Sequence, residues 1–255
     1  MLLVGEYAGQ PIGLVHLVSL HQGEYWCEGV RVAADYRGMG VGALLLQHGI
    51  ALAQAQAARV LRLLTDETNT GMQQLVARMG FRECLRATSY VAPAMTDMLP
   101  TAQPLDRSWL PQLAQLVHDA PVMPYSQGLY LHDWRCYRLT VERLHWHLEQ
   151  GDIVALPTYN GERAAAWAIA PAQRYPRPVC FVWGDMQPLA VLLRDLRCMQ
   201  VPMTTKKNWM YPADVAVRML LAEDSPAIPA LLAAGFAHYA VGERCYELVF
   251  AEHAG

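Results

Sequence analysis

The residues best suited to chemistry lie in a glycine-rich stretch between an apolar strand and an uncharged helix. Residues 37–42 read Arg-Gly-Met-Gly-Val-Gly; a strand is expected before them at residues 25–33, and a helix from residue 40 to about residue 57. Backbone N–H groups at a helix start have no intrahelical partner, and glycine lets a ligand approach them closely. The helix dipole adds about half a positive charge at this end. The stretch therefore predicts a site for pyrophosphate.

Two other interpretations of this stretch compete with phosphate binding. A glycine-rich turn can serve simply to let a helix pack close to a sheet, and this interpretation stays open. A dinucleotide-binding fold would need the motif after the first strand of a βαβ unit, with an acidic residue about 20 residues further on. Here three strands of antiparallel character come first, and the residues near Val60 are apolar, which excludes a dinucleotide fold.

The stretch resembles the acyl-CoA-binding motif of the GNAT superfamily of N-acetyltransferases. In that family a strand of the form Leu-x-Val precedes a Gln/Arg-x-x-Gly-x-Gly/Ala loop, and residues 37–42 fit this loop. Asn69 and the pair Gly80-Phe81 fit the downstream pattern at the usual spacing, and the order of elements over residues 2–91 agrees. The resemblance implies an acyl-CoA co-substrate, with acetyl-CoA expected.

The resemblance also implies how the co-substrate is held. Backbone groups of Val30 and Val32 would pair with the pantetheine arm, in a slot made where the third and fifth strands of the family fold splay apart. Asn69 would lie near the thiol end and can also cap the helix that follows it. The alternative for Arg37 is an ordinary surface arginine. The pyrophosphate would lie on the N–H groups of Arg37, Gly38, Met39, Gly40, Val41, Gly42 and Ala43.

Amide formation from an amine and a thioester needs a proton acceptor and an oxyanion donor, and two familiar catalytic positions are apolar here. Val76 stands where many family members have a tyrosine acid, and Leu64 where some have a glutamate base. The remaining carboxylate at a family-typical position is Glu28, which would act through a water molecule. An ion-paired strand residue is the equally weighted alternative for Glu28. The expected mechanism is direct attack of the amine, with an N–H near Val32 polarising the carbonyl.

Residues 95–105 contain two prolines and no periodicity, so they predict a linker between residues 1–97 and 98–255. The expected fold is α/β of the α+β type: a mixed, mostly antiparallel sheet flanked by helices, in two GNAT-like units in tandem. The first unit lacks the family's opening strand and helices. The second is degenerate, because residues 183–188 (Trp-Gly-Asp-Met-Gln-Pro) replace the phosphate loop. The second half either completes the acceptor site of the first, or the chain starts late.

Composition limits the partners. Charged residues are 17% of the 255, the hydrophobic share is 53% and the net charge is −3, so disorder is excluded and no basic field predicts nucleic acid or membrane as a partner. The six cysteines form no Cys-x-x-Cys pair and the N-terminus has no export signal, which predicts a cytoplasmic protein with reduced thiols. His145 and His147, two apart on a helix, point to different faces, so no metal site is expected.

The expected function is transfer of an acetyl group from acetyl-CoA to a small-molecule or peptide amine. The sequence does not identify this acceptor, because the acceptor-binding part is where the chain departs from the family. The alternative is a catalytically inactive acyl-CoA-binding or partner-docking protein, which Val76 and Leu64 favour. The low charge content is also compatible with a homo-oligomer or with an interface shared by the two units.

Overall fold

The computed structural model describes residues 1–119, 126–158, 161–199, 212 and 214–251. These residues form two compact units. Unit 1 comprises Met1–Arg86, Trp134–Tyr137 and Glu243–Gly255, and unit 2 comprises Ala87–Asp133 and Arg138–Gly242. Each unit therefore draws residues from both sides of the predicted linker. The division into tandem units at residues 97 and 98 stays a prediction.

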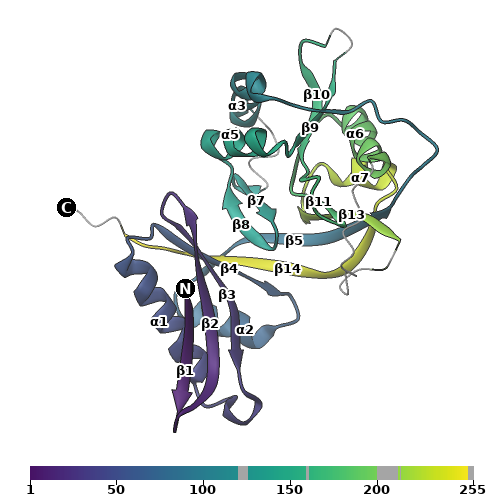
Figure 1. Ribbon diagram of the computed structural model, residues 1–255. Coiled ribbons are helices and arrows are strands. Elements are labelled where there is room, and N and C mark those ends of the chain that lie inside the picture. Colours follow the sequence, from purple (N-terminus) through teal and green to yellow (C-terminus); the bar gives the residue numbers. More distant parts are fainter. Residues whose placement is uncertain (120–125, 159–160, 200–211, 213, 252–255) are drawn as a thin grey trace. The chain divides into compact units, whose positions relative to one another are not determined.

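The sheet of unit 1 has the strand order β1-β2-β3-β4-β14-β5 (Figure 1). Neighbouring strands are antiparallel at β1–β2, β2–β3 and β4–β14, and parallel at β3–β4. Residues 82–86 of β5 and 243–249 of β14 belong to this unit. The elements are β1 (Leu2–Tyr7), β2 (Gln10–His21), β3 (Glu24–Val32), the 3-10 turn η1 (Ala34–Tyr36), α1 (Val41–Ala55), β4 (Val60–Asp66), α2 (Thr70–Arg78), β5 (Arg82–Pro93) and β14 (Ala237–Val249).

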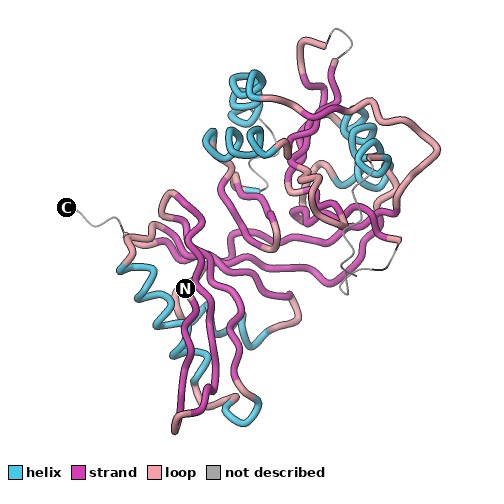
Figure 2. The backbone as a smooth tube through the Cα atoms, in the orientation of Figure 1, coloured by secondary structure: helices cyan, strands magenta, loops and turns pink. Residues whose placement is uncertain are grey.

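Helices α1 and α2 pack on one face of this sheet (Figure 2). Leu46 of α1 and Val76 of α2 are fully buried in one cluster with Leu61 and Leu63 of β4. Because successive strand residues point to opposite faces, the residues between these leucines face away from both helices. Burial of Val76 explains why this position is apolar: its side chain belongs to the core.

The last strand of the chain completes unit 1. The sequence predicts a strand pair around residues 237–251, but the structure has the single strand β14 there, so this prediction is wrong. Seven residues of β14 pair with β4, from Glu243 opposite Asp66 to Val249 opposite Val60. The local sequence does not show this pairing, because the two strands lie about 180 residues apart (Arg62 to Glu247 spans 185).

The pairing is reinforced by a buried guanidinium. Arg62 on β4 is 2% exposed, and it forms ion pairs with Glu24 on β3 at 3.2 Å and Glu247 on β14 at 3.0 Å. Removing one partner of a buried ion pair typically costs about 3–5 kcal/mol, because the remaining charge is left desolvated. Unit 1 therefore needs β14 for electrostatic reasons as well as for backbone pairing.

Unit 2 contains the strand orders β12-β10-β9-β6 and β14-β5-β13-β11, with residues 87–93 of β5 opposite β13. Strands β7 and β8 form a two-stranded sheet, and residues 135–137 of β8 belong to unit 1. The further elements are β6 (Gln103–Pro104), η2 (Arg107–Trp109), α3 (Leu110–Asp119), β7 (Leu129–His132), β8 (Arg135–Arg138), α5 (Val141–Gln150), β9 (Ile153–Pro157), β10 (Ala164–Ile169), β11 (Arg177–Val179), β12 (Phe181–Gly184), α6 (Met186–Cys198), β13 (Val215–Ala222) and α7 (Ile228–Ala233).

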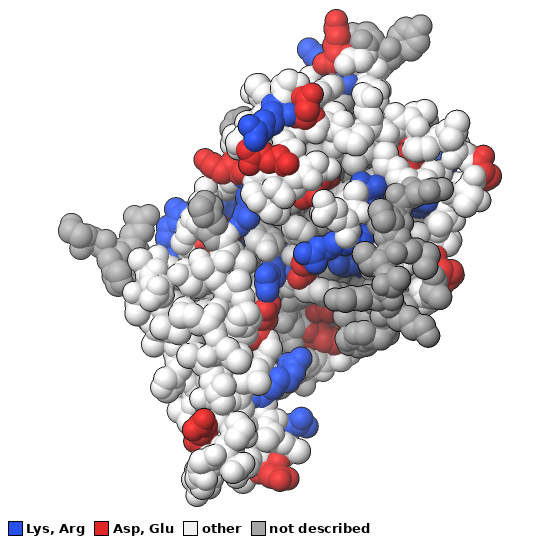
Figure 3. Space-filling model, in the orientation of Figure 1, with Lys and Arg blue, Asp and Glu red and all other residues white. Residues whose placement is uncertain are grey.

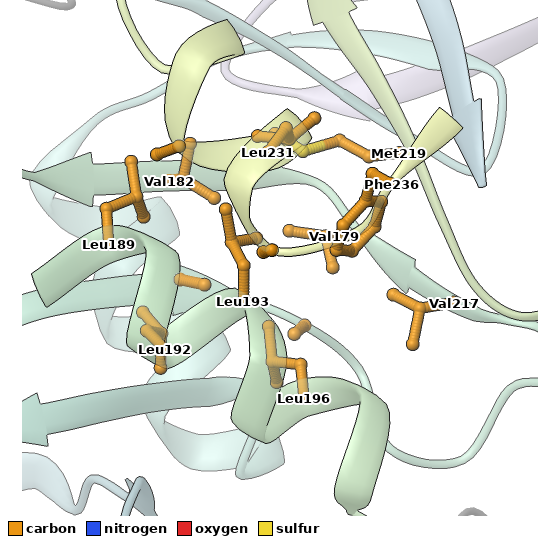
Figure 4. Packing of buried hydrophobic residues seen from close by; sticks show 14 of the residues in the cluster. Val179, Val182, Leu189, Leu192, Leu193, Leu196, Val217, Met219, Leu231 and Phe236 are labelled. Atoms are coloured by element: carbon orange, nitrogen blue, oxygen red, sulfur yellow. The ribbon is translucent and has the colours of Figure 1, made fainter. Parts of the chain in front are cut away.

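The core of unit 2 forms between α6, α7 and β13. Figure 4 shows Leu189, Leu193 and Leu196 of α6 directed toward Leu231 and Phe236, and all five are buried. This spacing of three and four residues places one face of α6 in the core. The sequence predicts a helix at residues 189–199, and α6 confirms it.

Part of the predicted linker is held firmly within unit 2. The buried carboxylate of Asp195 accepts hydrogen bonds from Thr101 N (2.7 Å), Thr101 Oγ1 (2.8 Å) and Ala102 N (2.8 Å). Residues 103–104 then form β6 beside β9. These residues of the predicted linker are therefore packed within unit 2.

The predicted fold class, a mixed and mostly antiparallel sheet flanked by helices, is confirmed. The sequence does not predict β6, β7, β8 and β11, which are two to four residues long. None of the helices in the described part of the chain is long and apolar enough to cross a membrane. On the face drawn in Figure 3, charged side chains are sparse, in keeping with their 17% share of the sequence.

We expect residues 1–97 expressed alone to lack stable structure, because β4 would lose its β14 neighbour and Arg62 would lose Glu247. Circular dichroism and thermal melting measure this directly. Fusing residues 237–251 to the fragment through a Gly/Ser linker should restore a cooperative transition. A fragment 1–97 that melts cooperatively without β14 would contradict the role given to that strand.

Candidate functional site

The glycine-rich loop leads directly into the N-terminus of α1. Gly40 is the N-cap with φ of +83°, and Gly38 has φ of +79°, a region that side-chain-bearing residues rarely adopt. The N–H of Leu44 donates to Gly40 O at 3.1 Å, which begins the helical hydrogen-bond pattern. The N–H groups of residues 41–43 consequently have no acceptor within the helix. This is the backbone arrangement that suits a phosphate group.

Arg37 is exposed beside this loop, and its Nε donates to Val32 O at 3.2 Å. The guanidinium is thus held near the carboxyl end of β3 and the start of α1. A cation in this place adds to the positive end of the helix dipole. Its position agrees with the predicted phosphate role, which stays a prediction.

Strands β3 and β4 stop pairing before either strand ends, and we call the interval between their unpaired parts the slot. They pair in parallel over only three residues each, 24–26 and 60–62. Beyond this point β3 continues to Val32 and β4 to Asp66. Because Ala33 N bonds Ile12 O on the β2 side, the backbone groups of Val32 point the other way, toward the separated strand. The splayed strands of this chain are therefore β3 and β4, and Val30 and Val32 lie along the slot.

Asn69 lies in the loop that follows β4. Its Oδ1 accepts from Met72 N at 3.2 Å, so it is the N-cap of α2, one of its two predicted roles. The loop itself is fixed by Asp66, whose Oδ1 accepts from Thr68 N at 2.7 Å. Asn69 therefore has a defined place beyond the open end of β4, where the resemblance puts the thiol. Its contact with that thiol stays a prediction.

The sheet face opposite α1 and α2 is rich in ionisable groups, and we call it the polar face. Cross-strand pairing and alternation place its members together: residues opposite one another on β4 and β14 share a face, as do alternate residues on one strand. Residues 135–137 of β8 lie in the same unit. The polar face comprises Glu24, Glu28, Arg62, Asp66, Glu243, Cys245 and Glu247.

Glu28, the predicted base, is ion-paired. Arg135 donates through Nη2 to Glu28 Oε1 at 2.9 Å and through Nε to Oε2 at 3.1 Å, while His16 Nδ1 lies 2.9 Å from Oε1. The hydrogen bonds from Arg135 lower the pKa of Glu28, outweighing the opposing effect of burial. A lowered pKa makes a carboxylate a weaker proton acceptor. These contacts are those of the ion-paired strand residue, and a catalytic role for Glu28 stays a prediction.

Sequence analysis missed two charged residues that matter for the polar face, one on β8 and one on β14. Arg135 lies 107 positions from Glu28 and comes from the unpredicted hairpin β7–β8. Glu243 lies opposite Asp66 on β14, whose pairing with β4 has no local signature. The sequence offered one signal: Glu28 is a carboxylate on a strand with no basic residue within two positions of it. This suggests that a cation comes from elsewhere in the chain but does not identify it.

The corresponding place in unit 2 has different chemistry. Helix α6 begins after Asp185, and its first turn contains Pro188. Gly184 has φ of +141°, and a Cβ there would lie 2.7 Å from the Cβ of Ala166. An acidic N-cap disfavours an anion, so the geometry agrees with the expectation that this helix start binds no pyrophosphate.

Comparison with known proteins shows which family and which solved structures this chain resembles. Residues 1–81 match the model of the Acetyltransferase (GNAT) family. A GCN5-related N-acetyltransferase from Sphaerobacter thermophilus superposes with a TM-score of 0.60 at 12% identity, over 94% of this chain and 78% of the other. A protein from Thermoplasma acidophilum described as an acetyltransferase gives 0.57 at 15% identity, over 98% and 78%. No curated protein has a significantly similar sequence.

The chain thus has the fold of GNAT acetyltransferases over nearly its whole length. The resemblance to the GNAT superfamily is confirmed: residues 1–81 carry the family's sequence pattern, and this segment contains the loop, the slot and Asn69. At these identities the solved structures establish the fold alone. The family match supports a transferase, while the donor, acceptor and reacting residues belong to the proposals below.

We expect Glu28→Gln to make stability less dependent on pH in acid. The pKa of Glu28 is lowered in the folded state, so its stabilisation is present above the ordinary glutamate pKa and is lost as pH falls through the folded value. Because the pair is partly exposed, the loss at neutral pH should be about 1 kcal/mol. Urea unfolding at several pH values measures both effects. An unchanged acid slope would show that Arg135 does not hold Glu28 in solution.

Proposed function

We propose that this protein is an acyl-CoA-dependent N-acyltransferase that transfers an acetyl group from acetyl-CoA to an amine. The observation that supports this most directly is the joining of two features in one unit. A glycine-cradled helix start follows β3, and β3 separates from β4 after three paired residues. The first suits a pyrophosphate, and the second leaves a strand edge for an amide-containing arm.

Different residues of unit 1 bind different parts of the co-substrate. The pyrophosphate binds the N–H groups of residues 37–43, with Arg37 beside it. The two amides of the pantetheine arm pair with backbone groups of Val30 and Val32. The thioester then lies toward Asn69, and the amine reaches it from the polar face, because α1 and α2 cover the other face. The acceptor is a small-molecule or peptide amine.

The reaction is direct attack of the amine nitrogen on the thioester carbonyl carbon. A backbone N–H near Val32 stabilises the developing oxyanion. The mechanism inferred from the sequence passes the ammonium proton to Glu28 through water. The two hydrogen bonds from Arg135 weaken this carboxylate as a base, which leaves room for another acceptor of the proton.

A second candidate function is acyl-CoA binding without catalysis. The observation that favours it is Val76, which is fully buried, so α2 offers no acid at this position. Leu64, where some relatives have a base, is likewise apolar.

A cytoplasmic location and a homo-oligomer also remain proposals.

Acetyl-CoA is expected to raise the melting temperature of the wild-type protein, and Arg37→Glu to weaken its binding by about 10–100-fold. The reason is that a charge-assisted hydrogen bond contributes about 1.5–3 kcal/mol. Calorimetric titration measures the affinity. Arg82→Glu, the same charge change at an exposed residue elsewhere in unit 1, is the control. No thermal shift with acetyl-CoA, or equal affinity of Arg37→Glu and wild type, would contradict the proposed co-substrate site.

Release of free CoA thiol separates the two candidate functions. With a panel of alkyl amines, amino acids, aminoglycosides and peptides, an acyltransferase should release thiol in proportion to amine concentration. Mass spectrometry should then find the acylated amine. Tight acetyl-CoA binding with no release for any amine would instead support the non-catalytic protein.

A further inference from the structure

Most carboxylates of the polar face are held by arginines. Glu24 and Glu247 flank Arg62, and Glu28 binds Arg135 through both of its oxygens. Each of these glutamates therefore has a structural reason to be ionised where it is. Their charges are neutralised within the face and do not favour an incoming cation.

Glu243 differs from them. It is half-buried on β14, directly opposite Asp66, and among the described residues no Lys, Arg or His side chain forms an ion pair with it. The charges that act on it are the carboxylates of Asp66 and Glu67. Asp66 is engaged in its own loop through Thr68. Glu243 thus places a carboxylate without a counter-ion next to a second one.

Its position relates it to the slot. Strand β4 leaves β3 after Arg62 and ends at Asp66, so Asp66 lies at the open end of the slot. Glu243 is the β14 residue paired with this end, and Asn69 follows three residues after Asp66. The pairing brings Glu243 to the end of β4 where the proposed function puts the thioester.

We propose that Glu243 is the catalytic carboxylate that takes the proton from the ammonium group of the acceptor, an inference that rests on the proposed acyltransferase function. Burial and the neighbouring charges of Asp66 and Glu67 raise the pKa of Glu243 to about 7. A proton acceptor works best when its pKa lies near the working pH. The same carboxylates attract a cationic amine.

The proton balance is as follows. The carboxylate of Glu243 takes one proton from R–NH₃⁺, giving a neutral carboxyl and R–NH₂. The amine nitrogen forms a C–N bond with the thioester carbonyl carbon, and collapse of the intermediate breaks the C–S bond, with the electron pair leaving on sulfur. A second nitrogen proton passes to the thiolate, giving the amide and CoA thiol. Glu243 then returns its proton to solvent.

The test is Glu243→Gln in the full chain, with kcat/KM for the best amine of the panel measured from pH 5 to 9. Loss of the base should lower kcat/KM by about 10²-fold or more at neutral pH. In the wild type, kcat/KM should fall as pH drops below about 7; this fall, the acidic limb of the pH profile, should be absent from the variant. The rate with an alkoxyamine, which is unprotonated at the assay pH, should fall far less, since no ammonium proton has to be removed. Melting temperature and acetyl-CoA affinity should stay at wild-type values.

Two further variants separate chemistry from structure. Asp66→Asn keeps an oxygen for Thr68 but removes a like charge, so the acidic limb should move to lower pH. Glu247→Gln, on the same strand and face, should lower the melting temperature through Arg62 and leave the limb in place. If Glu243→Gln lowered kcat/KM equally for the alkyl amine and the alkoxyamine, or left the acidic limb unchanged, the role of Glu243 would be overturned while the proposed acyltransferase function would stand. A wild type that releases no thiol with any amine would overturn the proposed function and this inference together.

Discussion

The buried ion-pair network around Arg62 is the interaction on which unit 1 depends. A guanidinium that is 2% exposed requires charged partners, and it finds Glu24 on one neighbouring strand and Glu247 on the other. Arg62 is also the last β4 residue paired with β3. The network therefore fixes the point from which the two strands diverge, and so fixes where the slot begins. Glu247 comes from β14, far along the sequence from β3 and β4, so the proposed site depends on non-local contacts.

Features of the fold with local causes could be predicted from the sequence. The glycine-rich loop leads into a helix as predicted, with Gly38 and Gly40 at positive φ, and Asn69 caps α2 as its position before a helix suggested. The uncharged helix after the loop is α1. In each case the controlling interaction lies within a few residues: a helix start, a cap or an apolar repeat of period 3.6. Such signals led to the co-substrate side of the proposed site.

The acceptor side could not be predicted in this way, because its interactions are non-local. Nothing near Glu28 in the sequence points to Arg135, and nothing near Asp66 points to Glu243. Sheet register follows from the burial pattern and pairing of whole strands. Because the pairing of β14 was not predicted, the neighbour of β4 on that side was unknown. The apolar residue Val76, which suggested lost chemistry, is explained by packing once α2 is seen against the sheet. A departure from a family pattern thus had a structural cause that the sequence alone did not show.

The distribution of charge on the polar face distinguishes Glu243 from the other glutamates there. This chain has few charged residues, and it uses arginine to neutralise three of the glutamates on that face. A neutral residue in place of Glu243 would favour stability, since like charges on paired strands are destabilising. Among the described residues of that face, Glu243 forms no ion pair, and it lies opposite Asp66 at the end of β4, at the open end of the slot. Residues that lower stability are expected where function requires them, and a cationic substrate would supply the missing charge.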